Sequence, residues 1–224
     1  MAQLKDPALD TFFSNLEFQI KHRAVKRIFD VLFSLTILVL FAPVFALIAL
    51  FIACTSKGPI VYAHKRIGRG GKLFKCYKFR TMHQDAEVRL QELLKKDAAL
   101  KAEWEANYKL KNDPRITSIG GFLRKTSLDE FPQFWNVLKG DLSVVGPRPV
   151  VLDEIIKHYG EKAGKVLSIR PGLTGLWQVS GRNDTSYASR ISLDEEYINN
   201  WSLGLDIKLV LKTIPAILSS RGAY

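Results

Sequence analysis

The longest apolar stretch of the chain extends from residue 28 to residue 54, and Asp30 is its one charged residue. A straight helix of about 27 residues is roughly 40 Å long, which is enough to cross a bilayer. Pro43 lies near the middle of the stretch, where it removes a helical hydrogen bond and clashes with the preceding turn. The stretch begins too late and is too long for a secretory signal peptide, and it lacks an Ala-x-Ala cleavage site. The pattern therefore predicts a membrane helix with a kink at Pro43.

Basic residues flank the stretch on both sides, so the positive-inside rule assigns both of its ends to the cytoplasm. The flanking residues are Lys21, Arg23, Lys26 and Arg27 before it, and Lys57, Lys65, Arg66, Arg69 and Lys72 after it. A helix that enters the membrane, bends at Pro43 and leaves by the same face satisfies this rule. The alternative is a kinked helix that spans the membrane once with an imperfect charge pattern.

The segment that follows predicts a small β-hairpin. Gly58-Pro59 ends the apolar stretch, and Ile60–Arg66 and Lys72–Phe79 have the composition of two short strands. The glycines between Gly68 and Gly71 form the expected turn. This GRGG sequence lacks the lysine-serine ending of a Walker A motif and the spacing of a dinucleotide fingerprint, so a phosphate loop is not expected.

The remaining periodic segments favour helices. Residues 85 to 112 are highly charged, with apolar residues interspersed, and favour an amphipathic helix or helix pair. The first twenty-odd residues and the segment Leu205–Leu218 each favour an amphipathic helix at a membrane surface. The acidic pairs Asp153-Glu154 and Glu195-Glu196 are interpreted as solvated helix faces.

The net charge of +11 is concentrated next to the apolar stretch, because residues 55 to 84 contain eight Lys or Arg and no acid. Such a segment attracts anionic headgroups and raises the local concentration of phosphorylated substrates. Aromatic residues within it are compatible with single-stranded nucleic acid, but no recognisable nucleic-acid-binding motif accompanies them, and we expect no nucleic-acid partner. Two cysteines and four scattered histidines form neither a zinc pattern nor a disulfide framework.

Two adjacent carboxylates, Asp129 and Glu130, stand among basic residues in the segment FLRKTSLDEFPQFWNVLKGDLSVVGPRP. Ser127 and Glu130 have capping-box spacing, and Pro132 is tolerated only near a helix start, so we expect a helix to begin at Leu128 or Asp129. A helix N-terminus favours anions, and nearby arginines add phosphate ligands. A carboxylate in this position can hold Mg²⁺ or attack phosphorus. In most chains, however, acidic residues in a first turn are caps only.

Four segments in this order resemble the bacterial sugar transferases, monotopic phosphoglycosyl transferases that start glycan assembly on polyprenyl phosphate. They are KTSLDEFPQFWNVLKGDLSVVGPRP, KRIFDVLFS at residues 26–34, KFRTM at 78–82 and IRPGLTGLWQVSGRND at 169–184. The resemblance extends over roughly residues 23 to 224. The C-terminal NWSLGLDIKLVLKTI and RGAY are most similar to the branch that acts on undecaprenyl phosphate and UDP-galactose.

This resemblance implies a mainly helical α+β fold with a re-entrant membrane hairpin kinked at Pro43, amphipathic interfacial helices and the small β-hairpin. It divides the chain into an N-terminal amphipathic segment (1–27), the re-entrant helix (28–54) and a cytoplasmic catalytic domain (55–224). It also implies residence in the bacterial inner membrane, where a UDP-sugar, undecaprenyl phosphate and membrane lipids are the partners. The oligomeric state is left open, and a homodimer is compatible with this prediction.

The resemblance assigns roles to individual residues. Asp129 would be the nucleophile and a ligand of Mg²⁺, and Glu130 would position or activate a reacting group. Basic residues would bind the phosphates, namely Arg148, Lys78 and Arg80, with Arg124 receiving the lipid phosphate. The nucleotide-sugar site would include Arg182, Asn183 and a further carboxylate, Asp194. The rival hypothesis is a non-catalytic, membrane-anchored basic protein that binds anionic lipid or nucleic acid.

Overall fold

The computed structural model describes residues 23–107, 110, 113–180 and 186–218 of the 224-residue chain, so the predicted helix in the first twenty-odd residues lies outside the described part. The apolar stretch forms two helices, α2 (Arg23–Leu40) and α3 (Ala42–Thr55), which are bent by 62° at the break between them. Pro43 is in the first turn of α3, where it cannot donate to the preceding turn. The predicted kink is therefore confirmed.

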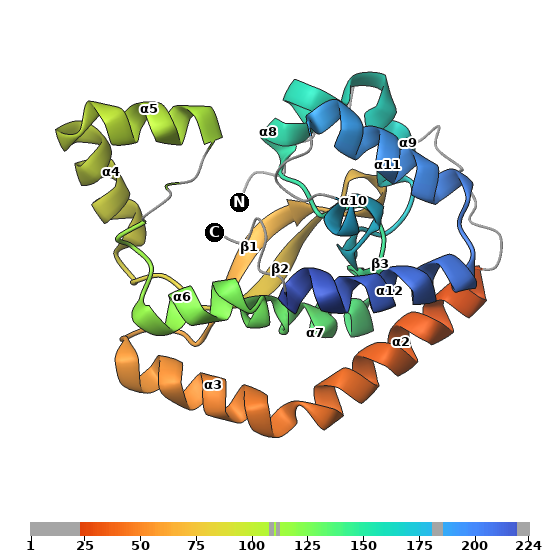
Figure 1. Ribbon diagram of the computed structural model, residues 1–224, viewed down its shortest axis with the longest axis horizontal. Helices are drawn as coiled ribbons and strands as arrows, with labels where there is room; N and C mark the ends of the chain where they lie inside the picture. The colour runs from red at the N-terminus through yellow and green to blue at the C-terminus, as the bar shows by residue number, and fades with distance from the viewer. Residues whose placement is uncertain (1–22, 108–109, 111–112, 181–185, 219–224) are drawn as a thin grey trace.

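Within the described residues, no single helix is long and apolar enough to cross a membrane. The bent pair α2–α3 meets that requirement only when its two arms are taken together, by length and composition. Figure 1 shows the pair running along the bottom of the molecule, with most of the other elements above it.

The predicted β-hairpin is confirmed, with three of the four strand ends shifted by one residue and the end at Phe79 as predicted. Strands β1 (Val61–Ile67) and β2 (Leu73–Phe79) pair antiparallel, with His64 opposite Cys76 and Tyr62 opposite Lys78. A single turn, η1 (Arg69–Gly71), joins them. Gly70 has a φ of 66°, which a side chain would disfavour.

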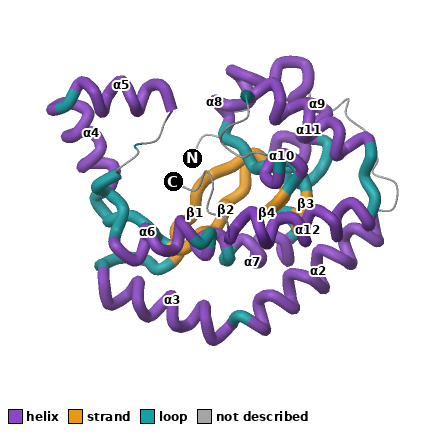
Figure 2. The backbone as a smooth tube through the Cα atoms, in the orientation of Figure 1, coloured by secondary structure: helices purple, strands orange, loops and turns teal. Residues whose placement is uncertain are grey.

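A second pair of short strands lies in the centre of the molecule (Figure 2). Strands β3 (Ser143–Val145) and β4 (Gly172–Thr174) are parallel, and they belong to the segments SVVGPRP and RPGLTG. A Cβ atom on Gly172 would lie 2.1 Å from the backbone nitrogen of Gly146. The two glycine-containing segments therefore pack backbone against backbone, which only glycine allows.

Helices surround these strands and confirm the mainly helical α+β class. The predicted pair in residues 85–112 is α4 (Ala86–Lys96) and α5 (Ala98–Asn107), which extends away from the rest in Figure 1. The predicted C-terminal helix is α12. The other elements are α6 (Ser118–Lys125), η2 (Leu128–Glu130), α7 (Gln133–Lys139), α8 (Leu152–Glu154), η3 (Ile155–Tyr159), η4 (Gly160–Lys162), α9 (Ala163–Leu167), α10 (Leu176–Val179), α11 (Tyr187–Asn199) and α12 (Leu203–Leu218).

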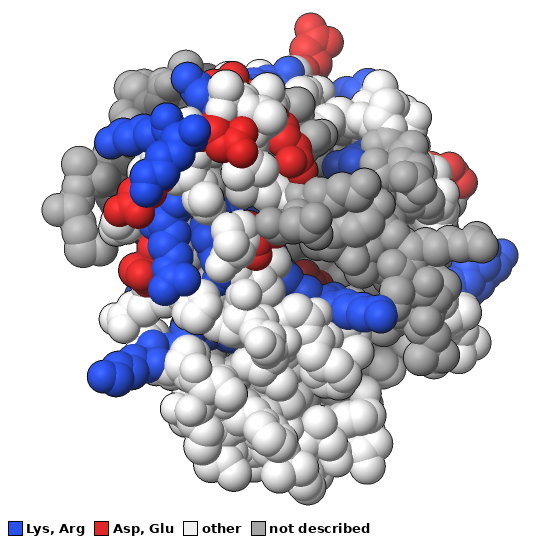
Figure 3. Space-filling model, turned by 60° about the vertical axis from the view of Figure 1, so that its left-hand side comes forward, with Lys and Arg blue, Asp and Glu red and all other residues white. Residues whose placement is uncertain are grey.

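The helix pair α2–α3 buries one side and exposes an apolar other side. On the inner side, Ile48 and Ile52 of α3 pack with Phe79 and Leu123. The exposed apolar residues of the pair are Val25, Ile28, Leu32, Leu35, Val39, Leu40, Val44, Leu47, Leu50 and Phe51. In Figure 3 the pair forms a lower lobe without charged side chains on the visible face, and Lys and Arg side chains lie above it. An exposed apolar surface of this extent is typical of a contact with a membrane or with another protein.

Candidate active site

Asp129 and Glu130 lie in a tight turn between two helices, not at the start of an α-helix. Helix α6 ends at Lys125, Ser127 adopts a left-handed φ of 58°, and the single 3₁₀ turn η2 carries both carboxylates. Helix α7 begins only after Pro132. Within the described chain Ser127 makes no side-chain capping bond, so the predicted capping box is wrong. The left-handed residue reverses the backbone there, and this reversal prevents a continuous helix.

Lys78 of β2 lies between the two carboxylates. Its Nζ is 2.5 Å from Oε1 of Glu130 and 3.8 Å from Oδ2 of Asp129. The Asp129 residue is 8% exposed, whereas the side chains of Lys78 and Glu130 are partly exposed, so the Lys78–Asp129 pair is the more shielded of the two. The structure thus brings together Asp129, Glu130 and Lys78, as the sequence predicted.

The two neighbouring carboxyl groups have opposite protonation preferences. Burial raises the pKa of Asp129 to about 6; the charge of Lys78 lowers it, and the charge of Glu130 raises it again. Burial also opposes ionisation of Glu130, but the charge and hydrogen bond of Lys78, followed by the charge of Arg148, hold its pKa below the usual value. Glu130 is therefore an anion at neutral pH, whereas Asp129 gains and loses its proton at a pH close to neutral.

Arg66 belongs to the same charged cluster, although the sequence interpretation placed it only among the basic flanks. In the strand register Tyr62 lies opposite Lys78, and Arg66 lies opposite Phe74. Tyr62 and Arg66 are four residues apart on β1, so their side chains share a face, and Arg66 and Lys78 therefore lie on the same face of the hairpin. Nη1 of Arg66 is 3.6 Å from Oε1 of Glu154. The charge of Arg66 also lowers the pKa of Glu130. The alternation of residues along the predicted strand is the signal that could have placed Arg66 in the site.

Glu154 corrects a second expectation. The pair Asp153-Glu154 was interpreted as a solvated helix face, but Glu154 contacts Arg66 at the edge of the cluster. Asp153 is exposed, as expected. Adjacent acidic residues point in different directions on a helix, so a doublet cannot be assigned as one unit.

Arg148 and Arg190 both lie over the ring of Trp177. The guanidinium carbon of Arg148 lies 5.8 Å from the centre of this ring, and that of Arg190 lies 4.8 Å from it. Trp177 is buried at 4% exposure. A cation within about 6 Å of the centre of an indole is attracted to the ring face, so Trp177 favours the position of both guanidinium groups. Trp177 and Arg190 are the residues of this group that the sequence interpretation missed.

The other predicted basic residues occupy different environments. Arg124 donates from Nε to Oγ1 of Thr81 at 2.9 Å. Burial lowers the pKa of Arg124, and the charge of Asp129 opposes this shift only in part. Arg80 instead donates to the carbonyl oxygens of Pro59 and Ser56, both at 2.6 Å. These bonds fasten the carboxyl end of α3 to the end of β2. Arg80 therefore has a structural role here, and its contact with phosphate stays a prediction.

Asp194, on α11, is 1% exposed, and burial raises its pKa to about 8. Burial raises the pKa of Tyr159, the charge of Asp194 raises it further, and the charge of Arg148 lowers it. Tyr159 thus lies near both Asp194 and Arg148, which places Asp194 near the cluster rather than at its centre. Arg182 and Asn183 lie outside the described residues.

Two glycines in the segment 170–175 pack against the backbone of the protein itself. A Cβ on Gly172 or Gly175 would collide with the backbone of Gly146, at 2.1 and 2.3 Å. These two glycines are required for close packing of the protein itself.

The carboxylates fit a magnesium ion that is shared with a substrate. Among the described residues, no group of three or more His, Cys, Asp or Glu side chains could hold a metal alone. Mg²⁺ in phosphate-transfer sites is commonly bound by one or two carboxylates together with substrate phosphates. Asp129, as part of a carboxylate pair at this turn, meets that requirement.

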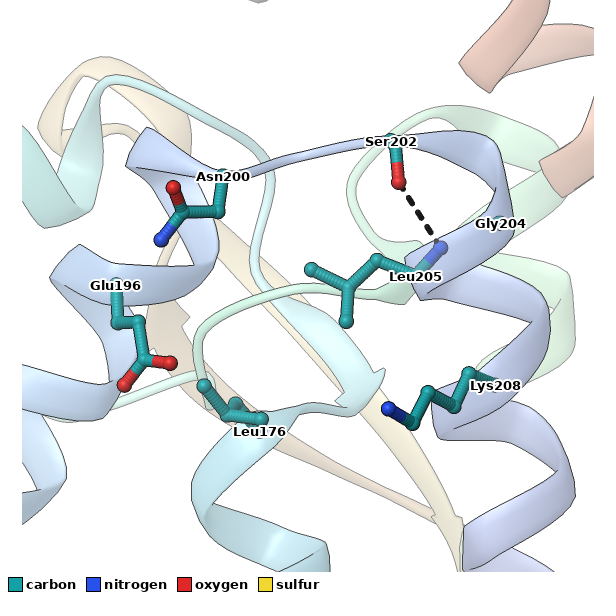
Figure 4. Close-up of a pocket in the computed structure, with 7 residues that line it drawn as sticks. All are labelled: Leu176, Glu196, Asn200, Ser202, Gly204, Leu205 and Lys208. Carbon is teal, nitrogen blue, oxygen red and sulfur yellow. Dashed lines mark hydrogen bonds between the residues drawn. The ribbon is translucent and has the colours of Figure 1, made fainter.

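A cavity of about 350 Å³ lies at the junction of α10, α11 and α12 (Figure 4). Its lining residues are Leu176, Glu196, Asn200, Ser202, Gly204, Leu205 and Lys208. Ser202 caps the start of α12 by accepting a hydrogen bond from the backbone nitrogen of Leu205, at 3.1 Å. The cavity is distinct from the charged cluster around Asp129.

The sequence profile of the family described as bacterial sugar transferase matches residues 21–220. The chain belongs to this family. It is 51% identical, over 90% of its length, to undecaprenyl-phosphate galactose phosphotransferase of Salmonella typhimurium, and it covers 42% of that protein. It is also 51% identical to the exopolysaccharide production protein ExoY of Rhizobium meliloti, with coverage of 89% of the chain and 88% of the relative. UDP-glucose:undecaprenyl-phosphate glucose-1-phosphate transferase of Escherichia coli is 36% identical over 97% of the chain and 44% of the relative.

These matches confirm the resemblance that the four sequence segments predicted. The chain spans less than half of the length of the Salmonella relative and most of the length of ExoY. The bacterial sugar transferase region is therefore the part that the chain shares with both relatives.

Proposed function

We propose that this bacterial sugar transferase transfers a sugar 1-phosphate from a UDP-sugar to undecaprenyl phosphate and releases UMP. The observation that supports this function is the turn in which buried Asp129 and partly exposed Glu130 share Lys78. One carboxylate is a fixed anion and its neighbour ionises near neutral pH, which is the division of roles expected of a charge partner and a nucleophile. Relatives named for galactose transfer are 48–51% identical, whereas those named for glucose are 36–38% identical. Galactose is therefore the favoured sugar.

In the first step, an Oδ atom of ionised Asp129 attacks the β-phosphorus of the UDP-sugar. A bond forms between this oxygen and phosphorus, and the bond from the β-phosphorus to the bridging oxygen breaks. The electron pair leaves with that oxygen on UMP, and the sugar phosphate remains on Asp129 as an acyl phosphate. Arg148 and Lys78 stabilise the negative charge that develops on the phosphoryl oxygens.

In the second step, a phosphate oxygen of undecaprenyl phosphate attacks the same phosphorus. The bond between phosphorus and Asp129 breaks, the carboxylate is restored, and the lipid carries a diphosphate-linked sugar. Arg124 lies at the edge of the cluster near the charge of Asp129, which supports its role in receiving the lipid phosphate. Glu130 keeps Lys78 in place during both steps.

Bound Mg²⁺ would neutralise pyrophosphate charge and improve the leaving group. Asp129 is the residue of the chain proposed to hold it, together with oxygens of the substrate. The structure keeps this carboxyl group largely out of water, so the group is available to the metal or to phosphorus without competition from bulk solvent.

The proposed acceptor requires a membrane, and α2–α3 supports a re-entrant contact with the cytoplasmic leaflet. Both ends of the pair attach to the same body: Lys26, near the start of α2, binds Asp206 of α12, and Arg80 binds Ser56 after α3. A helix pair whose two ends are held by one domain enters and leaves the bilayer on one side. This arrangement also supports residence in the bacterial inner membrane, with the domain in the cytoplasm.

The decisive experiment is release of UMP in the presence of Mg²⁺, UDP-galactose and undecaprenyl phosphate. UDP-glucose and the N-acetylated sugars serve as competing donors. A purified protein that binds anionic vesicles but releases no UMP with any donor would favour the non-catalytic binding protein instead.

The nucleophile is tested with a donor that carries a label in its sugar, incubated with Mg²⁺ but without lipid acceptor. Wild-type protein should acquire label at Asp129, and Asp129→Asn should acquire none, since an amide is a poor nucleophile. Asp153→Asn, at an exposed aspartate of another acidic pair, is the matched control and should label normally. Label mapped to Glu130 would reject Asp129 as nucleophile, whereas an active but never labelled enzyme would indicate direct attack by the lipid.

A further inference from the structure

Two adjacent basic residues at the start of α2 are anchored inside the protein. The sequence pattern counted Lys26 and Arg27 among the charges that set membrane topology, which would place them at a lipid surface. Lys26 is instead 7% exposed, and Arg27 is partly buried. Burying such charges is costly unless each has partners, so their partners indicate what the start of α2 does.

Lys26 joins α2 to α12 and, through Asp30, to β3. Its Nζ is 2.8 Å from Oδ2 of Asp206 and 3.1 Å from Oδ1 of Asp30. Oδ1 of Asp30 accepts hydrogen bonds from Oγ of Ser143, at 2.9 Å, and from the backbone nitrogen of Val144, at 3.0 Å. Strand β3 is thus fastened directly to α2.

Asp206 and Tyr197, at the other end of this network, hold the same strand at Val145. The hydroxyl of Tyr197 donates to Oδ1 of Asp206 at 2.8 Å and lies 3.0 Å from the carbonyl oxygen of Val145. Asp206 and Tyr197 are 0% and 1% exposed. Arg148 follows Val145 by three residues, so the network fixes the strand that leads into the phosphate-binding segment.

Arg27 attaches helix α7 to the same turn of α2. Its Nη1 donates to the carbonyl oxygen of Val137 at 2.5 Å, and its Nη2 donates to that of Leu138 at 2.7 Å. These carbonyls are at the carboxyl end of α7, where helices have unpaired acceptors and favour cations. Helix α7 follows directly on the turn that carries Asp129.

We propose that Lys26 and Arg27 are positioning residues that hold the Arg148 and Asp129 segments at one fixed height above the membrane hairpin. This inference rests on the proposed function. The donor is soluble and can approach the site from any height, whereas the phosphate of the acceptor is confined to the headgroup plane. A rigid link between the hairpin and both segments therefore serves the second step more than the first.

The test separates the two steps and uses two acceptors. Lys26→Met and Arg27→Lys are prepared as full-length protein in vesicles of phosphatidylethanolamine and phosphatidylglycerol. Arg27→Lys keeps the charge but loses the fork that reaches two carbonyls. Lys208→Met, at an exposed residue of α12 two positions from Asp206, is the matched control. Circular dichroism identifies a temperature at which every variant is folded.

We expect labelling by the UDP-sugar without acceptor to stay within about twofold of wild type. The KM for undecaprenyl phosphate should rise about tenfold, because small displacements of reacting groups are costly. The KM for a water-soluble short-chain prenyl phosphate should change by less than about twofold, since that acceptor is not confined to the bilayer. Lys208→Met should resemble wild type in all three measurements.

Equal losses in labelling and in both acceptor reactions would overturn the proposal and leave Lys26 and Arg27 with a stabilising role only. An unchanged KM for undecaprenyl phosphate in folded variants would overturn it as well. If Lys26→Met does not fold, Arg27→Lys carries the test alone. Failure of the proposed function is recognised separately, because wild-type protein would then neither label nor release UMP.

Discussion

At the scale of single residues, the chemistry depends on how Asp129 is ionised. Lys78 contacts both carboxylates, but its shorter contact is with Glu130. Asp129 consequently keeps a pKa of about 6, above the usual range, because burial outweighs the charge of Lys78. Asp129, the proposed nucleophile, is therefore mostly a carboxylate at neutral pH and mostly protonated under mildly acidic conditions.

The rate of labelling by UDP-sugar should therefore fall as the pH decreases through about 6, following the loss of the Asp129 carboxylate. Lys78→Met should move this midpoint to higher pH, since the lysine charge lowers the pKa of Asp129. Single-turnover labelling between about pH 5 and pH 8 provides the measurement. A midpoint that stays fixed in Lys78→Met would show that another group controls the profile.

Arg148 should depend on its planar shape as well as on its charge, because a planar guanidinium can bind phosphate through two parallel hydrogen bonds. We expect Arg148→Lys to lose at least about tenfold in kcat/KM, since a lysine keeps the charge near Trp177 but cannot make the paired hydrogen bonds. Lys125→Ala, at an exposed residue in the last turn of α6, is the control and should be much milder. Near-normal turnover by Arg148→Lys would show that the guanidinium is not a phosphate ligand.

The burial of Asp194 should lower the free energy of unfolding at neutral pH. Its pKa is raised from the usual 3.8 to about 8, so the folded state holds a proton that the unfolded state has released. Stability linked to this group is complete below about pH 4 and is lost as the pH rises toward 8. Asp194→Asn should increase the free energy of unfolding near pH 7 by roughly 1–3 kcal/mol, and by much less near pH 4. Chemical denaturation at the two pH values gives this comparison, and equal effects at both would contradict the shifted pKa.

At the scale of elements, α6 is placed by a glycine that touches the KFRTM segment. A Cβ on Gly120 would lie 2.0 Å from the carbonyl oxygen of Thr81, whereas a Cβ on the neighbouring Gly121 would meet nothing within 4 Å. Thr117 caps the helix by accepting from the backbone nitrogen of Gly120 at 3.0 Å. This close contact fixes the helix that carries Arg124 and leads into the Asp129 turn.

Gly120→Ala should destabilise the protein by roughly 1–3 kcal/mol because the backbone contact with Thr81 cannot relax without moving α6. Gly121→Ala should instead be neutral or stabilise it by up to about 1 kcal/mol, since alanine favours an exposed helix position. Thermal unfolding of the two variants is directly comparable. Equal stabilities would show that the approach of α6 to Thr81 is looser than this geometry requires.

The elements also show which features the sequence could predict. The hairpin, the kink near Pro43 and helix α12 followed from local signals: turn glycines, a missing donor and an apolar period. The turn at Asp129 did not, because Ser127 has the residue type of a helix cap but adopts a left-handed backbone. The KFRTM motif also does not reveal that Arg80 binds the end of α3. The alternation along the hairpin could have placed Arg66 on the face of Lys78, but the position of Trp177 beside Arg148 depends on segments far apart in the sequence.

At the scale of the whole molecule, the bent pair is too short in each arm to cross a bilayer. Helices of 18 and 14 residues are about 27 and 21 Å long, compared with a hydrocarbon core of about 30 Å. The start of α2 is also occupied by the domain, because Lys26 is bound to Asp206. The two arms together are long enough for a kinked span, so it is the attachment of both helix ends to one domain that supports the proposed re-entrant hairpin over that span.

Cysteine labelling in oriented inner-membrane vesicles distinguishes the two topologies. Cysteines placed at Ala24 and Lys72, in a background with Cys54 and Cys76 replaced, should both react with a membrane-impermeant maleimide from the cytoplasmic side. A third cysteine at Val39, just before the break, should be protected from both sides, since this residue belongs to the exposed apolar surface that we expect to face lipid.

Pro43→Leu restores a helix hydrogen-bond donor and removes the clash, so it should shift part of the population toward a straight span. If the cysteines at positions 24 and 72 react from opposite sides in protein that keeps Pro43, the re-entrant hairpin is excluded. That result would also contradict the attachment of both helix ends to one domain.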